Sequence, residues 1–244
     1  MPIPVRPDRP SLDQALASAA TKRPYVRDLF CTIARRYDLI TRLLSYGADQ
    51  RWKQRLIVAA RVSRGSRVLD LACGTGDLAL LARARGGNVV ALDFAEPMID
   101  LARRKSGARD IAWVVGDMGA LPIASDRVDV VTTGYGLRNV PDLAVAIAEM
   151  HRVLRPGGLA CSLDFDRPRS AIVRVVYLTY LTIVGSVLGW ALHGNPDTLR
   201  YISASFRRYP GASAVAEMMR GAGFRDVTHQ RLLGGLMALH VAAK

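Results

Sequence analysis

Residues 68–77 have the sequence VLDLACGTGD, in which an apolar run leads into two glycines and then into a helical pattern. Glycine at such a turn lets the backbone approach a ligand closely, and the helix after it presents free N–H groups. The dinucleotide-binding pattern GxGxxG fails here, because no third glycine follows Gly74 and Gly76 at the required spacing. Asp70 precedes the turn, where a carboxylate can bind an ammonium group. This arrangement favours the methionine part of S-adenosylmethionine over a pyrophosphate.

Two later acidic residues extend this candidate cofactor site. Asp93 ends the next apolar run, where a carboxylate can accept hydrogen bonds from ribose hydroxyls. Gly116-Asp117-Met118 follows the third run, where an adenine ring would lie beside a carboxylate and an apolar side chain. Together the three segments favour a bound cofactor over a Rossmann scaffold without a ligand, whereas Asp117 alone favours neither.

Short apolar runs alternate with helical patterns from Val68 onward, which is typical of βαβ units and a mostly parallel sheet. We therefore predict the α/β, Rossmann-like fold of class I S-adenosylmethionine-dependent methyltransferases, with a mostly parallel seven-stranded sheet and a C-terminal antiparallel hairpin. The expected strands are residues 67–72, 88–93, 111–115, 128–132, 159–164, 224–232 and 236–243. The expected helices are residues 26–44, 49–62, 77–84, 97–104 and 143–154.

The pattern also predicts how the chain is divided. Residues 1–20 are expected to be a disordered or weakly ordered tail, and residues 21–244 a methyltransferase domain. Within it, residues 21–64 would form cap helices over the ligand crevice, and residues 166–210 an apolar lid insertion. The uncharged segment 175–192 is nearly long enough to cross a bilayer. A single span would separate the hairpin from the rest of its sheet, so we expect a helical lid.

The net charge of the chain indicates which classes of partner it could bind. Lys and Arg number 34 against 21 Asp and Glu, which gives a formal charge of +13. Such an excess favours contact with nucleic acid or with an anionic membrane face.

The cysteines and histidines show no spacing typical of metal ligands, so no metal site is expected. An odd number of cysteines also argues against a disulfide framework and favours a reducing cytoplasm. We interpret each histidine as structural. These residues are Cys31, Cys73, Cys161, His151, His193, His229 and His240.

Three further stretches carry a family resemblance. The most specific is GLRNVPD at residues 136–142, after the fourth expected strand. The second joins Tyr201, Ser205 and Tyr209-Pro210 to GGLMALH at residues 234–240. The third comprises Phe30, Ile33-Ala34, Tyr37-Asp38, Ser45, Gly47 and Arg51-Trp52. With these motifs, residues 30–244 resemble the ubiquinone/menaquinone biosynthesis C-methyltransferases.

The resemblance implies methylation of the ring of a prenylated quinol, either demethylmenaquinol or the benzoquinol of ubiquinone biosynthesis. It implies S-adenosylmethionine as cofactor and places contacts to it on Thr75, Asp93, Asp117, Met118 and Gly134. The whole expected cofactor set is Asp70, Gly74, Thr75, Gly76, Asp93, Phe94, Asp117, Met118 and Gly134.

Arg138 and Asn139 stand just after the fourth strand, where ligands bind in open α/β sheets. With the resemblance, they are the leading catalytic candidates, together with Tyr201. Arg138 would stabilise a phenolate, and Asn139 would orient the ring oxygen or a water molecule. Tyr135 and Tyr201 would flank the ring. By composition alone, Arg138 would be a capping or surface residue, and only the family motif reverses that interpretation.

The expected partner is a prenylated quinol, and no nucleic acid is expected. Basic residues on both sides of segment 175–192 fit a cytoplasmic enzyme that contacts an anionic membrane from its inner face. The lid either holds a polyprenyl tail and contacts lipid or is a buried core helix, and both interpretations have equal weight. A homodimer is compatible with the sequence. The alternative functions are methylation of another small hydrophobic acceptor, methylation of nucleic acid, and a non-catalytic binding role.

Overall fold

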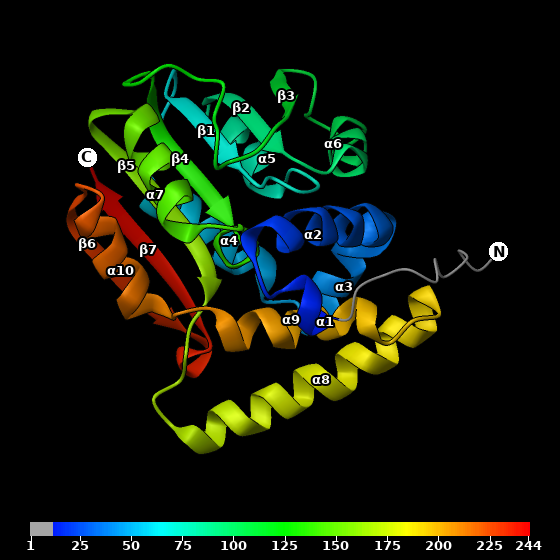
Figure 1. The fold of residues 1–244 in the computed structure, drawn as a ribbon. Helices are drawn as coiled ribbons and strands as arrows, with labels where there is room; N and C mark the ends of the chain where they lie inside the picture. Colours follow the sequence, from blue (N-terminus) through cyan, green and yellow to red (C-terminus); the bar gives the residue numbers. More distant parts are fainter. Residues whose placement is uncertain (1–11) are drawn as a thin grey trace.

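A seven-stranded sheet forms the centre of the protein, whose computed structural model describes residues 12–244 (Figure 1). The strand order is β3-β2-β1-β4-β5-β7-β6, with β1 to β5 parallel and β7 antiparallel to both of its neighbours. The predicted mostly parallel sheet with a terminal hairpin is confirmed. The strands are β1 Arg67–Leu71, β2 Asn88–Asp93, β3 Ile111–Val115, β4 Val128–Gly134, β5 Leu154–Phe165, β6 Arg225–Leu232 and β7 Met237–Ala243.

The register of the sheet brings the candidate ligand residues to one edge. Leu71 lies beside Leu92 of β2 and Thr133 of β4, so the three strands end together. Leu69 and Leu71 are fully buried, because helices cover both faces of a parallel sheet. The loops after β1, β2 and β4 therefore meet at the carboxyl edge, where open α/β sheets bind ligands.

Helices flank the sheet, with α7 and α10 in front of it and α4 behind it in Figure 1. Most of them match the expected segments within a few residues. The helices on the sheet are α4 Asp49–Ala59, α5 Asp77–Ala84, α6 Glu96–Arg103, α7 Leu143–Val153 and α10 Ala212–Gly221. The others are α1 Leu12–Ala15, α2 Ala19–Ile33, α3 Tyr37–Leu44, α8 Ala171–His193 and α9 Asp197–Arg208.

The N-terminal region differs from its prediction in two ways. Residues 26–44 do not form one helix, because the 3-10 turn η1 (Ala34–Arg36) separates α2 from α3. Residues 12–20 contain α1 and the start of α2, whose capping box at Ser18 satisfies the first N–H groups. Residues 12–20 therefore carry ordered helical structure joined by a short turn, in place of the expected disordered or weakly ordered tail, and residues 1–11 lie outside the described part of the chain.

Helix α8 packs closely against α9 on the outside of the molecule (Figure 1). Glycines permit this approach, because a Cβ at Gly189 would lie 2.8 Å from the Asn195 carbonyl oxygen and one at Gly185 would lie 3.2 Å from that of Leu199. Within residues 12–244, α8 is the one helix long and apolar enough to cross a membrane, and only 17% of its apolar window is buried. This exposure distinguishes α8 from a buried core helix. Strand β7 returns to pair with β5, so both ends of α8 join the same domain.

Candidate active site

The turn after β1 is held by a carboxylate from the end of β2. Asp93 accepts hydrogen bonds from the Gly74 amide at 2.8 Å and the Ala95 amide at 2.9 Å. Ala72, Gly74 and Gly76 all have positive φ, which explains the glycines in this loop. Burial raises the pKa of Asp93 to about 6. Asp93 thus fixes the shape of the turn and also lines the cavity beside it.

That cavity has a volume of about 420 Å³ and combines apolar walls with two carboxylates. Four expected cofactor residues line it, namely Asp93, Phe94, Asp117 and Met118, together with Arg23, Ala72, Leu92, Gly116, Gly136, Asn139, Val140 and Pro141. A Cβ at Gly116 would lie only 2.8 Å from Leu92 Cδ1, so the wall needs a glycine there. Apolar walls suit an adenine ring, and carboxylates suit its amino group and the ribose hydroxyls. The residues present therefore fit S-adenosylmethionine.

The other expected cofactor residues do not line this cavity. Gly74, Thr75 and Gly76 form the turn after β1, whereas Asp70 lies in β1 and Gly134 at the end of β4. Asp70 is fully buried and accepts a hydrogen bond from Thr132 Oγ1 at 2.8 Å, while its Oδ2 has no hydrogen-bond partner within residues 12–244. Burial raises the pKa of Asp70 to about 7. Thr75 Oγ1 donates to Asp38 Oδ1 at 2.5 Å.

Two of the expected cofactor glycines are explained by packing. A Cβ at Gly76 would lie 2.5 Å from Trp113 Cη2, and one at Gly134 would lie 3.0 Å from Leu78 Cδ1. Gly74 is less crowded, since a Cβ there would lie 3.7 Å from Tyr37 Cε1.

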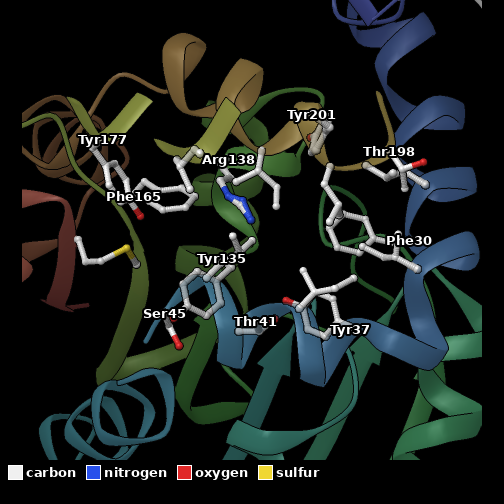
Figure 2. A pocket seen from close by; sticks show the side chains of 18 of the residues that line it. Phe30, Tyr37, Thr41, Ser45, Tyr135, Arg138, Phe165, Tyr177, Thr198 and Tyr201 are labelled. Atoms are coloured by element: carbon white, nitrogen blue, oxygen red, sulfur yellow. The ribbon is translucent and has the colours of Figure 1, made fainter. Parts of the chain in front are cut away.

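A second cavity, of about 720 Å³, lies between helices α2, α3, α8 and α9 and the ends of β4 and β5 (Figure 2). Its wall is almost entirely apolar and aromatic, with Arg138 as the charged side chain among the described lining residues. The lining consists of Leu29, Phe30, Ile33, Tyr37, Ile40, Thr41, Leu44, Ser45, Trp52, Tyr135, Arg138, Phe165, Tyr177, Leu181, Thr198, Leu199, Tyr201, Ile202 and Met237. Such a wall suits a large apolar acceptor with one polar end.

Arg138 is a buried cation with unused hydrogen-bond donors. Its side chain is 8% exposed and points into the large cavity in Figure 2. Nε lies 3.5 Å from Asp164 Oδ1, and neither Nε nor Nη1 has a hydrogen-bond partner among the described residues. The guanidinium carbon lies 4.7 Å from the centre of the Phe165 ring. Unused donors on a buried guanidinium are rare, because an unsatisfied buried polar group costs free energy, and they provide a site for an anionic oxygen.

Asn139 stands between the two cavities. It lines the smaller one, accepts a hydrogen bond from the Tyr201 hydroxyl at 2.9 Å, and donates to the Tyr135 carbonyl at 2.7 Å. Tyr135 and Tyr201 line the larger cavity. Burial raises the pKa of Tyr201, so its hydroxyl stays protonated and donates to Asn139. The structure thus brings all three expected catalytic residues together, but the amide of Asn139 already has partners.

Two basic residues of α2 belong to the site and were missed from the sequence. Arg23 lines the cofactor cavity and forms an ion pair of 2.9 Å with Asp117. Lys22 donates to the carbonyls of Arg138 and Val140 at 3.1 and 2.6 Å. Burial, with Arg138 nearby, lowers the pKa of Lys22 to about 8. Both residues lie more than ninety positions before their partners, and no sequence pattern marks them.

The fold and the cofactor cavity define an S-adenosylmethionine-dependent methyltransferase. The fold is similar to that of such a methyltransferase from Thermotoga maritima, with a TM-score of 0.63, 18% identity, and coverage of 90% of this chain and 99% of that one. It is also similar to one from Mesorhizobium loti, with a TM-score of 0.57, 19% identity, and coverage of 78% and 96%. At these identities the likeness concerns the fold.

The chain belongs to the ubiE/COQ5 methyltransferase family, whose model matches residues 18–244. It is 42% identical over 217 residues to a demethylmenaquinone methyltransferase of Thermus thermophilus, which covers 87% of this chain and 98% of the relative. It is 38% identical over 226 residues to the ubiquinone/menaquinone biosynthesis C-methyltransferase UbiE of Geobacter sulfurreducens, which covers 90% and 88%. The family resemblance inferred from the motifs is confirmed.

Proposed function

We propose that this methyltransferase transfers a methyl group from S-adenosylmethionine to a ring carbon of a prenylated quinol, with demethylmenaquinol as the preferred acceptor. The observation that carries the proposal is Arg138, which places unused donors inside an apolar cavity of about 720 Å³ next to the cofactor cavity. The names of the relatives support a quinone precursor. The benzoquinol of ubiquinone biosynthesis is the second candidate.

The geometry suits methylation at carbon. Bound S-adenosylmethionine supplies an electrophilic methyl group, and the acceptor carbon becomes nucleophilic when a neighbouring hydroxyl loses its proton. Arg138 would stabilise the phenolate oxygen with Nε and Nη1, and the rings of Tyr135 and Tyr201 would confine the quinol ring. Asn139 would fix Tyr201 and the backbone of Tyr135 between the two ligands. The principal contribution of these residues is orientation, because methyl transfer needs an in-line approach.

The experiment is methyl transfer from labelled S-adenosylmethionine to reduced demethylmenaquinone and to a prenylated methoxybenzoquinol. We expect label in the quinol with the wild-type protein, faster with demethylmenaquinol, and a loss of about 10²- to 10³-fold in kcat for Arg138→Ala. Cofactor affinity should be unchanged in this variant, since Arg138 does not line the cofactor cavity. Absence of transfer to both quinols by a protein that binds the cofactor would refute the acceptor assignment.

We also propose that the enzyme works in the cytoplasm, docked on an anionic membrane through α3 and α8. Both helices expose large apolar side chains, and the stacked rings of Tyr46 and Tyr180, 5.5 Å apart, join the two regions. We call these residues the apolar face: Leu39, Leu43, Tyr46, Ile183, Val187 and Trp190. The opposite side of α8 lines the acceptor cavity through Tyr177 and Leu181, so a tail could pass from lipid to the cavity around one helix.

Flotation with phosphatidylglycerol vesicles at low salt tests this docking. The wild type should float with the vesicles, because its charge of +13 adds electrostatic attraction to the apolar face. Val187→Asp should reduce flotation without changing cofactor binding. A wild type that stays in the soluble fraction at low salt would refute the docking. A second copy of the chain is the other occupant to consider, and sedimentation without lipid would reveal a dimer through this face.

A further inference from the structure

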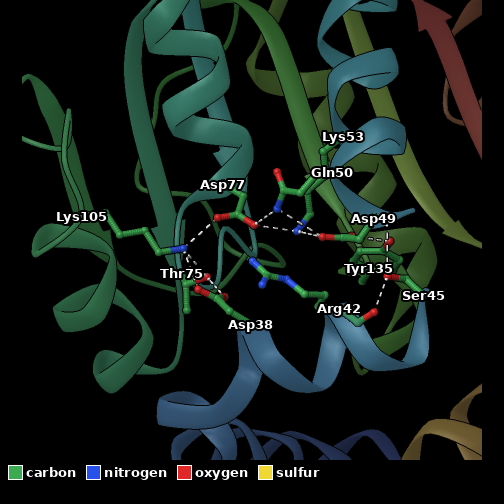
Figure 3. A network of polar contacts seen from close by, with 10 residues as sticks. All are labelled: Asp38, Arg42, Ser45, Asp49, Gln50, Lys53, Thr75, Asp77, Lys105 and Tyr135. Atoms are coloured by element: carbon green, nitrogen blue, oxygen red, sulfur yellow. Dashed lines mark hydrogen bonds and ion pairs between the residues drawn. The ribbon is translucent and has the colours of Figure 1, made fainter. Parts of the chain in front are cut away.

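A chain of hydrogen bonds and ion pairs runs from the acceptor cavity to the cofactor turn (Figure 3). It begins at Tyr135, which lines the acceptor cavity and whose hydroxyl donates to Asp49 Oδ1 at 2.7 Å. Lys53 Nζ lies 2.6 Å from Asp49 Oδ2 and 2.9 Å from Asp77 Oδ2. From Asp77 the chain continues through Lys105 at 2.8 Å to Asp38 at 2.9 Å.

Exposure increases along this chain from one end to the other. The side chains of Asp49 and Lys53 are 6% and 8% exposed, whereas Asp77 is 19%, Lys105 is 27% and Asp38 is 51% exposed. The chain therefore connects the buried Tyr135 hydroxyl with solvent through alternating carboxylates and ammonium groups. Asp49 and Asp77 raise the pKa of Lys53 despite its burial, and Lys53 and Lys105 lower the pKa of Asp77, so this part of the chain stays ionised and holds Asp49 in place.

Stability alone does not explain this arrangement. A buried ion pair gains little free energy, because the loss of hydration of both charges offsets their attraction. Tyr135 also has φ of 60°, a backbone conformation that costs free energy in a residue other than glycine and that is concentrated at functional sites. In this conformation the Tyr135 hydroxyl donates to Asp49.

The acceptor cavity otherwise offers no proton acceptor among its described lining residues. It contains no carboxylate and no imidazole, and its ionisable groups are Tyr37, Tyr135, Arg138, Tyr177 and Tyr201. The Tyr201 hydroxyl donates to the Asn139 amide, which is not a base. Tyr135 differs, because its hydroxyl donates directly to a carboxylate.

We propose that Tyr135 and Asp49 remove the hydroxyl proton of the acceptor, with the ion chain holding Asp49 in position to receive it. This step rests on the proposed quinol acceptor. The O–H bond of the quinol breaks and its proton goes to Tyr135 Oη, while the Tyr135 proton goes to Asp49 Oδ1. The phenolate faces Arg138. Tyr135 is a catalytic residue in this scheme, and Asp49 acts through it.

The remaining steps balance atoms and charge. The activated ring carbon forms a bond to the methyl carbon, and the electron pair of the broken S–C bond stays on sulfur. The dienone that results tautomerises, so that its ring C–H proton ends on the ring oxygen and the methylated quinol is formed. One proton is given up by the substrates overall, and it is held on Asp49 Oδ1 at the end of the transfer.

The test compares Tyr135→Phe with Tyr209→Phe. The first variant keeps the aromatic ring and removes the relay hydroxyl, and we expect kcat to fall by about 10²-fold with KM for both substrates within about threefold. The second removes a buried hydroxyl that has no hydrogen-bond partner in the described part of the chain, and its kcat should equal that of the wild type. In the double variant Tyr135→Phe/Asp49→Asn, the loss should be no greater than in either single variant, because the two groups act as a unit.

The pH profile separates a relay from a structural role. Tyr135 is surrounded by Asp49 and Lys53 of α4, Tyr37 of α3 and Arg138 of η2 (Leu137–Asn139). In Tyr135→Phe the acceptor must ionise without help, so kcat should rise about tenfold per pH unit until the quinol itself ionises. A loss that is equal at every pH, or a variant with full activity while Arg138→Ala is inactive, would overturn the relay. Failure of the wild type to methylate either quinol would instead refute the acceptor.

Discussion

The two cavities of this enzyme are built in different ways. The cofactor cavity is built mainly from turns at the ends of β1, β2 and β3, which follow one another within about fifty residues, with Arg23 of α2 and the segment 136–141 after β4 completing it. The acceptor cavity combines helices from the first fifty residues with α8 and α9, more than one hundred residues later. The first combines apolar walls with two carboxylates beside a hydrogen-bonded turn, whereas the wall of the second is almost entirely apolar and aromatic. Substitutions should therefore affect the binding of one ligand and spare the other.

The largest effect on the cofactor side is expected for Asp93→Ala. This change removes the acceptor of the Gly74 and Ala95 amides, so the turn loses two charge-assisted hydrogen bonds in addition to the predicted ribose contact. We expect S-adenosylmethionine affinity to fall by about 100-fold, measured by calorimetry, with an intermediate loss for Asp93→Asn. Binding of the quinol should change less than threefold. An equal loss for both ligands would contradict the separation of the two cavities.

The matching change on the acceptor side is Leu181→Ala. Leu181 is buried on the inner side of α8 and lines the acceptor cavity. If the proposed tail lies in this cavity, truncation removes apolar contact with it, and we expect KM for the quinol to rise by about tenfold, with KM for the cofactor unchanged. Val175→Ala makes a smaller truncation at an exposed position of the same helix and serves as the control. If both variants behave alike, the tail lies elsewhere.

A smaller and purely thermodynamic effect is expected from Asp70. Burial raises the pKa of Asp70 to about 7 in the folded protein, above its unfolded value of about 3.9. The unfolded state therefore loses this proton first, and the stability that protonated Asp70 contributes is lost as the pH rises from about 4 to about 7. The free energy of unfolding of Asp70→Asn, relative to that of the wild type, should therefore be larger at pH 8 than at pH 5. Thermal unfolding at both pH values measures this difference, and equal shifts would contradict it.

The sequence predicted the cofactor side in more detail than the acceptor side, for a physical reason. A glycine turn between a strand and a helix is a local feature, so the positions of Asp93, Asp117 and Met118 along the chain sufficed to place them at the cavity. The apolar segment 175–192 predicted a helix, but its pattern did not say which side would be exposed. Gly185 and Gly189 determine that side, because they allow α9 to approach only there.

Some local roles were hidden from the sequence for a related reason. Gly76 and Gly134 stay predicted ligand contacts, and the structure adds that each also accommodates a neighbouring side chain from another element. Asp70 stays a predicted ammonium site, and one of its oxygens also accepts a hydrogen bond from Thr132 of β4. The break between α2 and α3 was equally hidden, since neither proline nor glycine marks it. Tertiary packing decides such roles, and a single strand or helix does not contain that information.

The smallest expected effect concerns Arg23, a residue of α2 that lines the cofactor cavity. Arg23 forms an ion pair with Asp117, which lines the same cavity, and the Arg23 side chain is largely exposed. Exposed ion pairs contribute little, so Arg23→Ala should change cofactor affinity by less than about fivefold. The direction is informative, because Arg23 competes with the ligand for Asp117 and its removal should strengthen binding at low salt. Screening by salt should reduce the difference, which titration at two ionic strengths measures. Weaker binding in the variant would mean that Arg23 contacts the cofactor directly.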